Sequence, residues 1–506
     1  MPSTTVINNK GREIKTMKSF KTLVLSMSIL GLSACSIAPV QVNERDFVTA
    51  AQSDVAKIQQ EMAPITGPIT LEEAVARALK YNLDHRVSVM ERTLAGFQLE
   101  AGKFDMLPEL VAKAGYSWRN KESTRKSLNP NTGTISEVGF ISSSKESNLN
   151  DLGLSWSVLD FGVSYYTAQQ NADRVLIAME QRRKTMHNLI QKVRTTYWQA
   201  LAAEDLQNRV VSAIESAEQA LQTSAKANSI LAQAPTEALR FQRNLMENLN
   251  LLEDIQEELQ SKRAELANLM GLLPGTLFTL APRDFADITA HNIPLEELEE
   301  KALGNNPDVR KSYLNARIAA LDTRSAILKL LPGIRLNYGY NYSDDEYLIN
   351  QRWGEAGATV SFNLFNLFSQ HWVMGAAKTK QTIADTRRMA VQMAVLTQVH
   401  LANREYHDAI RKFNRIDGMF KLDRALAQQA QNELDVKAGT KLDQVASEVR
   451  LILSTVRRYR GIAMIHEASS RLQATVGIEP EISSLDNLTL EELSAQLEDN
   501  LESWRI

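Results

Sequence analysis

The chain has 506 residues, of which 44% are hydrophobic, 23% are charged and one is cysteine, and its formal net charge is −3. A single cysteine excludes intrachain disulfides, cysteine-based metal sites and a catalytic thiol away from Cys35. The slight acidic excess argues against nucleic-acid binding. Beyond residue 34 no apolar stretch reaches the ~20 residues of a membrane-spanning helix, so any membrane contact must be made by strands.

The first 34 residues have the pattern of an export signal. A short basic region is followed by an apolar run over 22–30 and by Leu32-Ser33-Ala34-Cys35, which resembles the lipobox of bacterial lipoproteins. We expect translation from Met17, a lipoprotein signal peptide over 1–34, lipidation of Cys35 and an extended, lipidated lead-in over 35–67. Ser36, a neutral residue after the cysteine, then implies delivery to the outer membrane. The alternative is a plain signal peptide in which Cys35 is an incidental thiol.

An internal repeat organises the rest of the chain. ITLEEAVARALKYNLDHR at 69–86 matches IPLEELEEKALGNNPDVR at 293–310 without gaps, at an offset of 224 residues. The match extends through Leu107-Pro108 and Leu331-Pro332, and further pairs follow at 155–160 with 361–366. A repeat of this length is too long for a solenoid and indicates a duplicated domain. We therefore expect a first repeat over 68–285, a second over 286–480, and an acidic C-terminal tail over 481–506.

The two repeats have the same predicted layout. One helix opens each repeat and stops at Pro108 or Pro332, because proline cannot continue a helix interior. Two strands of alternating polarity follow, at about 109–119 and 151–159, then 333–343 and 356–365, with polar loops between them. Helical hairpins come next, at about 164–270 and 367–477, and the leucines at 245, 249, 252, 259 and 266 follow the spacing of a heptad seam.

The strands predict a membrane sheet that one chain cannot close. Each has about ten residues and one apolar face, as in outer-membrane barrels, whereas four strands leave two unpaired edges that lipid does not tolerate. Two or three chains could supply eight or twelve strands, and a soluble sheet packed on the helices is the alternative. The residues expected to face lipid are Leu110, Ala112, Tyr116, Leu154, Trp156, Leu336, Tyr338, Tyr340, Val360 and Phe362. Those expected to face the lumen are Lys113, Ser117, Arg335, Asn337 and Asn363.

The ordered set of motifs in this chain resembles the TolC-like outer-membrane factor family. The motifs are the lipobox, the duplicated LEEAVARAL and LEELEEKAL openers, the Leu-Pro junctions, the strand ends VLDFG and NLFN, and the AGTKLDQV turn. This resemblance covers roughly residues 69–480. It implies a homotrimer with a twelve-stranded barrel and a periplasmic α-helical tunnel. It also implies docking with a periplasmic adaptor and an inner-membrane transporter.

The resemblance further assigns roles to the second helical hairpin. Its turn, Ala438-Gly439-Thr440, would dock the adaptor, and Glu448, nine residues after the glycine, would line the periplasmic constriction with Asp443 nearer the tip. The first hairpin lacks a glycine in its turn at 234–236, which leaves its docking role open. The alternative for Glu448 and Asp443 is that both are ordinary solvated helix charges.

The sequence contains no catalytic constellation. It has no Walker-type phosphate loop, no G-x-S-x-G and no HExxH, and His400 and His407 lack accompanying carboxylates at metal-ligand spacing. We expect no enzyme activity, cofactor or metal, and an outer-membrane location with a periplasmic extension. The predicted function is a passive exit duct for small-molecule efflux. The alternatives are a channel for protein or polysaccharide secretion and, more distantly, a periplasmic coiled-coil scaffold without a conduit.

Overall fold

The computed structural model describes residues 42–230, 235–282, 293–436, 438, 441–479 and 488–503, and the chain divides into two compact units, 1–62 and 63–506. In the first unit, the described residues form helix α2 (Glu44–Glu61), none of whose side chains is buried. The Asp46 carboxylate accepts a hydrogen bond from the Asn43 backbone N–H (3.2 Å), which caps its first turn. The expectation of an extended lead-in is wrong over these residues, because no proline or glycine interrupts 44–61.

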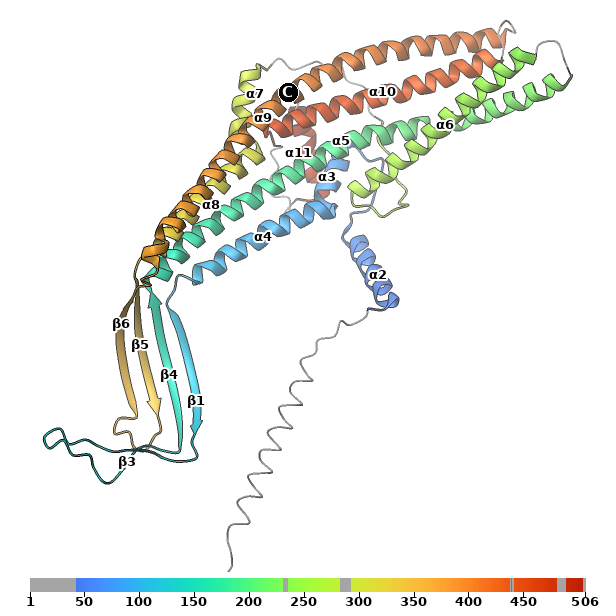
Figure 1. The fold of residues 1–506 in the computed structure, drawn as a ribbon. Coiled ribbons are helices and arrows are strands. Elements are labelled where there is room, and N and C mark those ends of the chain that lie inside the picture. Colours follow the sequence, from blue (N-terminus) through green and yellow to red (C-terminus); the bar gives the residue numbers. More distant parts are fainter. Residues whose placement is uncertain are drawn as a thin grey trace, which may run out of the picture. The chain divides into compact units, whose positions relative to one another are not determined.

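The second unit contains two copies of the same series of elements (Figure 1), and the mainly helical fold class with a small sheet is confirmed. The elements of the first repeat are α3 (Leu71–Tyr81), α4 (Leu83–Phe104), β1 (Glu109–Trp118), β4 (Glu146–Ser157), α5 (Val158–Ile230) and α6 (Pro235–Leu269). Those of the second are α7 (Leu295–Asn305), α8 (Pro307–Leu328), β5 (Gly333–Ser343), β6 (Arg352–Ser361), α9 (Asn366–Asp435) and α10 (Lys441–Val476). A small ribbon of β2 (Ser123–Arg125) and β3 (Phe140–Ser143) lies within the long loop of the first repeat.

Each repeat opens with two helices where the sequence predicts one. Asn82 ends α3 and caps α4 by accepting a hydrogen bond from the His85 N–H (3.1 Å). Asn306 does the same between α7 and α8, where its side chain accepts from Asp308 and Val309 and Pro307 follows at the first helical position. Asparagine is a strong N-cap and proline favours the first turn, so these two positions restart the helix.

The four longer strands form one antiparallel sheet in the order β1-β4-β5-β6. β4 begins earlier than expected, and it ends at Ser157 because α5 starts directly at Val158. Gly162 is therefore helical, and a Cβ at this position would lie 2.6 Å from Leu328 Cδ2 of α8. The glycine permits α5 and α8 to approach closely just beneath the sheet.

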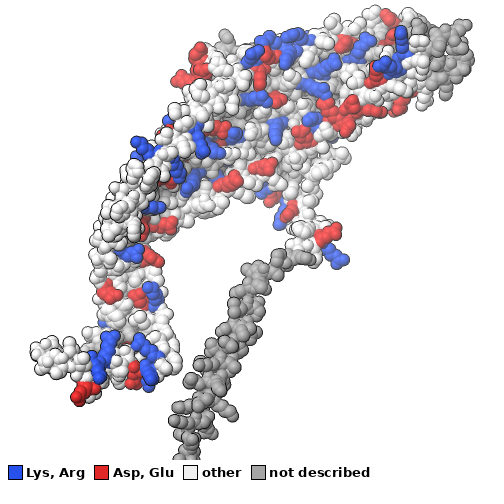
Figure 2. Space-filling view, in the orientation of Figure 1, with Lys and Arg blue, Asp and Glu red and all other residues white. Residues whose placement is uncertain are grey.

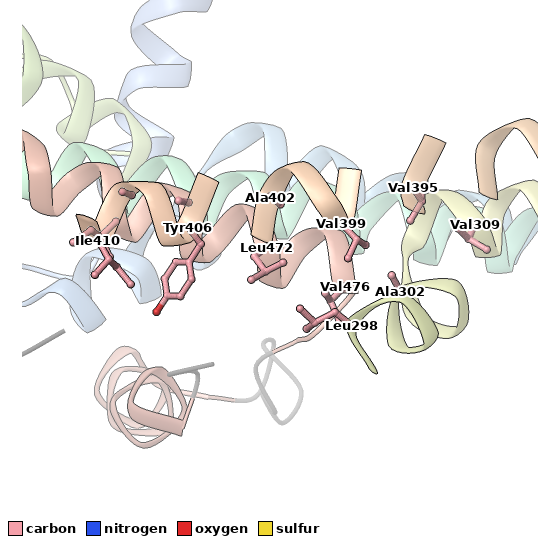
Figure 3. Close-up of a cluster of buried hydrophobic side chains, with 13 residues drawn as sticks. Leu298, Ala302, Val309, Val395, Val399, Ala402, Tyr406, Ile410, Leu472 and Val476 are labelled. Carbon is pink, nitrogen blue, oxygen red and sulfur yellow. The ribbon is translucent and has the colours of Figure 1, made fainter. Parts of the chain in front are cut away.

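The long helices pack through apolar seams. Leu245, Leu252 and Leu266 of α6 are fully buried and Leu259 is 7% exposed, as the predicted seam requires, whereas Leu249 is only partly buried. Helix α7 contributes Leu298 and Ala302 to a cluster with Val399 of α9 and with Leu472 and Val476 of α10 (Figure 3). This buried cluster ties the short opening helix of the second repeat to its long hairpin.

Polar contacts fix the first repeat against the second. Helices α5 and α8 run antiparallel, and Gln170 Nε2 donates to Asp322 Oδ1 (2.8 Å) while Arg317 Nε donates to Asp173 Oδ2 (2.8 Å). Further along, Lys184 Nζ donates to Asp308 Oδ2 (2.7 Å). The contacts continue the sheet's β4–β5 pairing into the helical body, so the two repeats share one frame.

The C-terminal residues are not merely an acidic tail. Residues Leu490–Ser503 form helix α11, in which Leu493 and Leu497 are fully buried. Helix α11 packs on α3, and Lys80 Nζ donates to the Leu488 carbonyl oxygen (2.8 Å). The predicted tail is therefore wrong over these residues, because leucines spaced four apart supply an apolar stripe that the overall acidity hides.

Candidate functional site: the two-faced sheet and the helical hairpins

The register of the sheet separates its side chains into two faces. Leu154 lies opposite both Leu110 and Tyr338, and Leu336 lies opposite both Trp156 and Ala358. Because side chains alternate along a strand, these residues share one face across the four strands. The residues predicted to face lipid within the strands all lie on it. Phe362 falls just beyond the end of β6.

The apolar face is exposed in the single chain. Leu110 is 66% exposed, Tyr116 62%, Tyr338 54% and Val360 69%. All four are aliphatic or aromatic side chains of the kind that is usually at least partly buried. An uncharged surface continues onto the first turns of α9 (Figure 2), where Phe365, Leu367, Phe368 and Trp372 are exposed. Soluble monomers rarely leave so much contiguous apolar surface in water. This face has to be covered by lipid or by another chain.

The opposite face of the sheet is polar. Ser155 Oγ donates to Asn337 Oδ1 (3.0 Å), Ser117 and Ser147 hydroxyls lie 2.8 Å apart, and Lys113 Nζ lies 3.9 Å from Asp151 Oδ2. Arg335 shares this face between Ser157 and Thr359. Lys113, Ser117, Arg335 and Asn337 are thus together, as expected, whereas Asn363 follows the end of β6 and belongs to neither face of the sheet.

The two helix-to-strand junctions have equivalent geometry. Pro108 lies between the end of α4 at Phe104 and the start of β1 at Glu109, and Pro332 lies between Leu328 and Gly333. The helices end a few residues before each proline, in turns closed by Leu107 N–H to Phe104 O (3.0 Å) and Leu331 N–H to Leu328 O (3.0 Å). The residue before a proline is pushed toward extended backbone, which directs the chain into the sheet.

Glu448 has a partner that the sequence did not indicate. Its Oε1 accepts a hydrogen bond from Arg209 Nη2 of α5 (3.0 Å), and the two side chains are 33% and 38% exposed. They border a groove of about 310 Å³ between α5 and α10, lined also by Ser212, Gln444 and Val445. Eleven residues along α10, the Tyr459 hydroxyl donates to Asp205 Oδ2 of α5 (3.0 Å), and burial together with Asp205 raises the pKa of Tyr459. Glu448 is therefore part of an interhelical clamp.

Several predicted site residues lie outside the described residues. These are Cys35, Gly439 and Thr440. Ala438 is described, and its N–H donates to the Glu433 carbonyl oxygen (2.8 Å) at the end of α9. Asp443 is exposed in the first turn of α10. The structure thus brings Ala438 and Asp443 to the same end of the α9–α10 hairpin and places Glu448 further along α10.

The described residues include no group of three or more His, Cys, Asp or Glu that could hold a metal ion. His400 Nε2 lies 2.6 Å from Glu299 Oε1, so His400 of α9 pairs with a carboxylate of α7 and not with His407. Within the same described part of the chain, no helix is long and apolar enough to cross a membrane.

Comparisons with known proteins agree with this geometry. The model of the outer membrane efflux protein family matches residues 74–272. The Campylobacter jejuni CmeC outer membrane channel has a TM-score of 0.64 at 15% identity, with 84% of this chain and 89% of that chain covered. The Neisseria gonorrhoeae MtrE outer membrane channel in its open state has a TM-score of 0.59 at 15% identity, covering 83% and 94%.

The outer membrane protein VceC from Vibrio cholerae is similar as well, with a TM-score of 0.59 at 14% identity and coverage of 80% and 96%. No curated protein matches the chain significantly. The solved structures share the described series of helices and strands over at least four-fifths of this chain. Residues 74–272 thus match the model of the outer membrane efflux protein family, and the two repeats together have the fold of these solved outer-membrane channels.

Proposed function

We propose that the protein is the outer-membrane channel of a tripartite export system and serves as a passive exit duct for small-molecule efflux. The observation that carries the proposal is the four-stranded sheet with one exposed apolar face, one polar face and two open edges. In lipid such a sheet is stable only when other copies pair with both edges, which places the polar face around a lumen. The family description and the shared fold support efflux as the process.

Three copies would also cover an apolar stripe on α4. Leu83, Val87, Met90, Leu94, Phe97 and Phe104 follow heptad spacing and are 52–71% exposed. Helix α8, the repeat equivalent of α4, packs on both α5 and α9, whereas α4 packs on α5 and α3. By the symmetry of the repeat, the free side of α4 would meet α9 of a neighbouring copy. The helices would then close into a ring beneath the barrel.

We further place Cys35 as the acylated N-terminus and the α9–α10 hairpin end, with Ala438, Gly439 and Thr440, as the surface that an adaptor contacts. The lipid would add an anchor to a body already held by its strands. An inner-membrane transporter would supply the energy, since the sequence has no phosphate-binding loop of its own. Mass spectrometry of the mature protein tests the anchor: cleavage before another residue without an acyl chain would remove it from the proposal.

Planar-bilayer recording of the purified full-length protein tests the conduit itself. We expect discrete single-channel conductance steps, carried by particles whose mass corresponds to three chains. A coiled-coil scaffold would give no steps at any protein concentration. Absence of conductance from a preparation that inserts into the bilayer would reject the duct.

Replacing Glu448 by alanine should raise single-channel conductance and weaken the preference for cations. The change removes both the clamp to Arg209 and a carboxylate that three copies would bring toward one axis. Because both partners are about one-third exposed, the clamp contributes at most about 1 kcal/mol per chain. The matched control is Arg209→Ala, which breaks the same ion pair and keeps the carboxylate. It should also raise conductance but strengthen cation preference. Unchanged conductance and selectivity in Glu448→Ala would remove this residue from the constriction.

A further inference from the structure

The two edge strands, β1 and β6, are related by the internal repeat to strands that already pair. Strand β1 corresponds to β5 at an offset of 224 residues, and β4 corresponds to β6 at an offset of 206. The observed pairing obeys these offsets, since Glu109 lies opposite Ser155 and Gly333 lies opposite Ser361. Both hairpins therefore have the same register. The β4–β5 pairing, which joins the repeats, has an equivalent only between β6 and β1 of different copies.

Applying the offsets to β4–β5 gives one register for that missing pairing. Gly153 lies opposite Gly339 in the structure, and the equivalent positions are Thr359 and Gly115. We propose that β6 of one copy pairs antiparallel with β1 of the next, with Thr359 opposite Gly115 of the neighbouring copy. This proposal rests on the trimeric channel proposed above. Each chain then donates one edge and receives one, so the assembly closes without a free edge.

This register matches side-chain size on the apolar face, although size played no part in its derivation. Each row places a large side chain of one copy opposite a small or less bulky one of the other. Opposed side chains on one face contact each other directly, so such alternation fills the junction without overlap. The rows that lie within both strands, with the residue of β1 first, are Trp118 with Ala356, Tyr116 with Ala358, and Ala114 with Val360.

The polar face adds charge complementarity. The register places Arg119 of the neighbouring copy opposite Glu355. Arg119 continues the β1 ladder through its N–H to the Lys145 carbonyl oxygen (2.7 Å), and its guanidinium has a 3.5 Å contact with Ser143 Oγ. Neither Arg119 nor Glu355 forms an ion pair with the described residues of its own chain. The junction would give both charges a partner.

Neighbouring registers lack these matches. Sliding β1 by two residues one way sets Arg119 opposite Trp353 and Ala114 opposite Ala358, which leaves a gap between two small side chains. Sliding it the other way sets Arg119 opposite Gly357, so that Arg119 and Glu355 no longer face each other. A slip by one residue would turn the apolar face of β1 toward the lumen.

Paired cysteines test the register in the full-length chain. Ser117→Cys with Gly357→Cys should crosslink neighbouring copies into covalent trimers, because directly opposed residues lie about 4.5–5.5 Å apart at Cα, within disulfide range. Gly357 has open space for the new side chain. The matched control is Ser117→Cys with Thr359→Cys, which the register separates diagonally by about 7–8 Å. Each single variant controls for crosslinking through Cys35.

A charge exchange provides the second readout. Arg119→Glu and Glu355→Arg should each lower the temperature at which the trimer dissociates in detergent, and the double variant should recover at least half of the loss. Stronger crosslinking in the control pair than in the Ser117–Gly357 pair, or no recovery in the exchange, would overturn this register while the trimer stands. A native mass of one or two chains would instead overturn the trimeric channel and the junction together.

Discussion

Leu336→Arg should prevent or strongly impair assembly of the trimer in the outer membrane, whereas Asn337→Arg should leave assembly intact. Leu336 lies on the apolar face between Trp156 and Ala358, and it is 42% exposed. An arginine on the lipid side of a barrel costs about 2–4 kcal/mol near the midplane and less toward the interfaces. Three copies incur that cost in every channel.

The adjacent position is a close control, since it receives the same substitution one residue along the same strand. Asn337 lies on the polar face, where Ser155 donates to it and Arg335 is already present. Losing that exposed hydrogen bond costs only about 0.5–1.5 kcal/mol. Folded trimer in outer-membrane fractions, separated from monomer on gels without boiling, is the quantity to measure. Equal tolerance at both positions would contradict a lipid-facing sheet and favour a soluble one.

Acidification should destabilise the helical body through His187 of α5. This side chain is 4% exposed, and its Nε2 has no hydrogen-bond partner in the described part of the chain. Burial, and to a smaller extent the positive charge of the nearby Arg183, lowers the pKa of His187 to about 4. Between about pH 6.5 and pH 4 the unfolded chain binds a proton that the folded chain excludes. The free energy of unfolding therefore falls as the pH is lowered through this window, by up to about 3 kcal/mol per chain.

His187→Leu should flatten this pH dependence, because leucine has a similar volume and no proton to gain. The thermal midpoint in detergent, recorded from pH 8 to pH 4.5, measures the effect. His85 is also buried, and its lowered pKa adds a change in the same direction, so the flattening should be partial. His371→Leu, at an exposed position of α9, should retain the full acid dependence. A His187→Leu profile identical to that of the natural protein would exclude His187 as the source.

The elements that the sequence predicts well are those with a period or a repeat. The alternation of polar and apolar residues with a period of two predicts that Leu336 and Asn337 lie on opposite faces of the sheet. The heptad spacing predicts that Leu245 and Leu252 lie in one seam, and the 224-residue offset indicates two equivalent units. These signals are local, or are copies of one local signal, and they survive in the fold because each buries or exposes one whole face. The strands β4 and β6 begin earlier than the sequence predicts, because Glu146 pairs with Trp118 at the end of β1 and Arg352 pairs with Tyr342 near the end of β5.

Only the tertiary structure decided the contacts between residues that lie far apart in the chain. Arg209 meets Glu448 at a separation of 239 residues, and Lys80 meets the carbonyl of Leu488 at a separation of 408. No periodicity encodes such pairs, because a charged side chain on a helix surface has the same local pattern whether water or another helix faces it. The sequence by itself therefore determined the repeat, its long helices and its two-faced strands. The packing of those helices decided which charges pair and that the C-terminal leucines are buried.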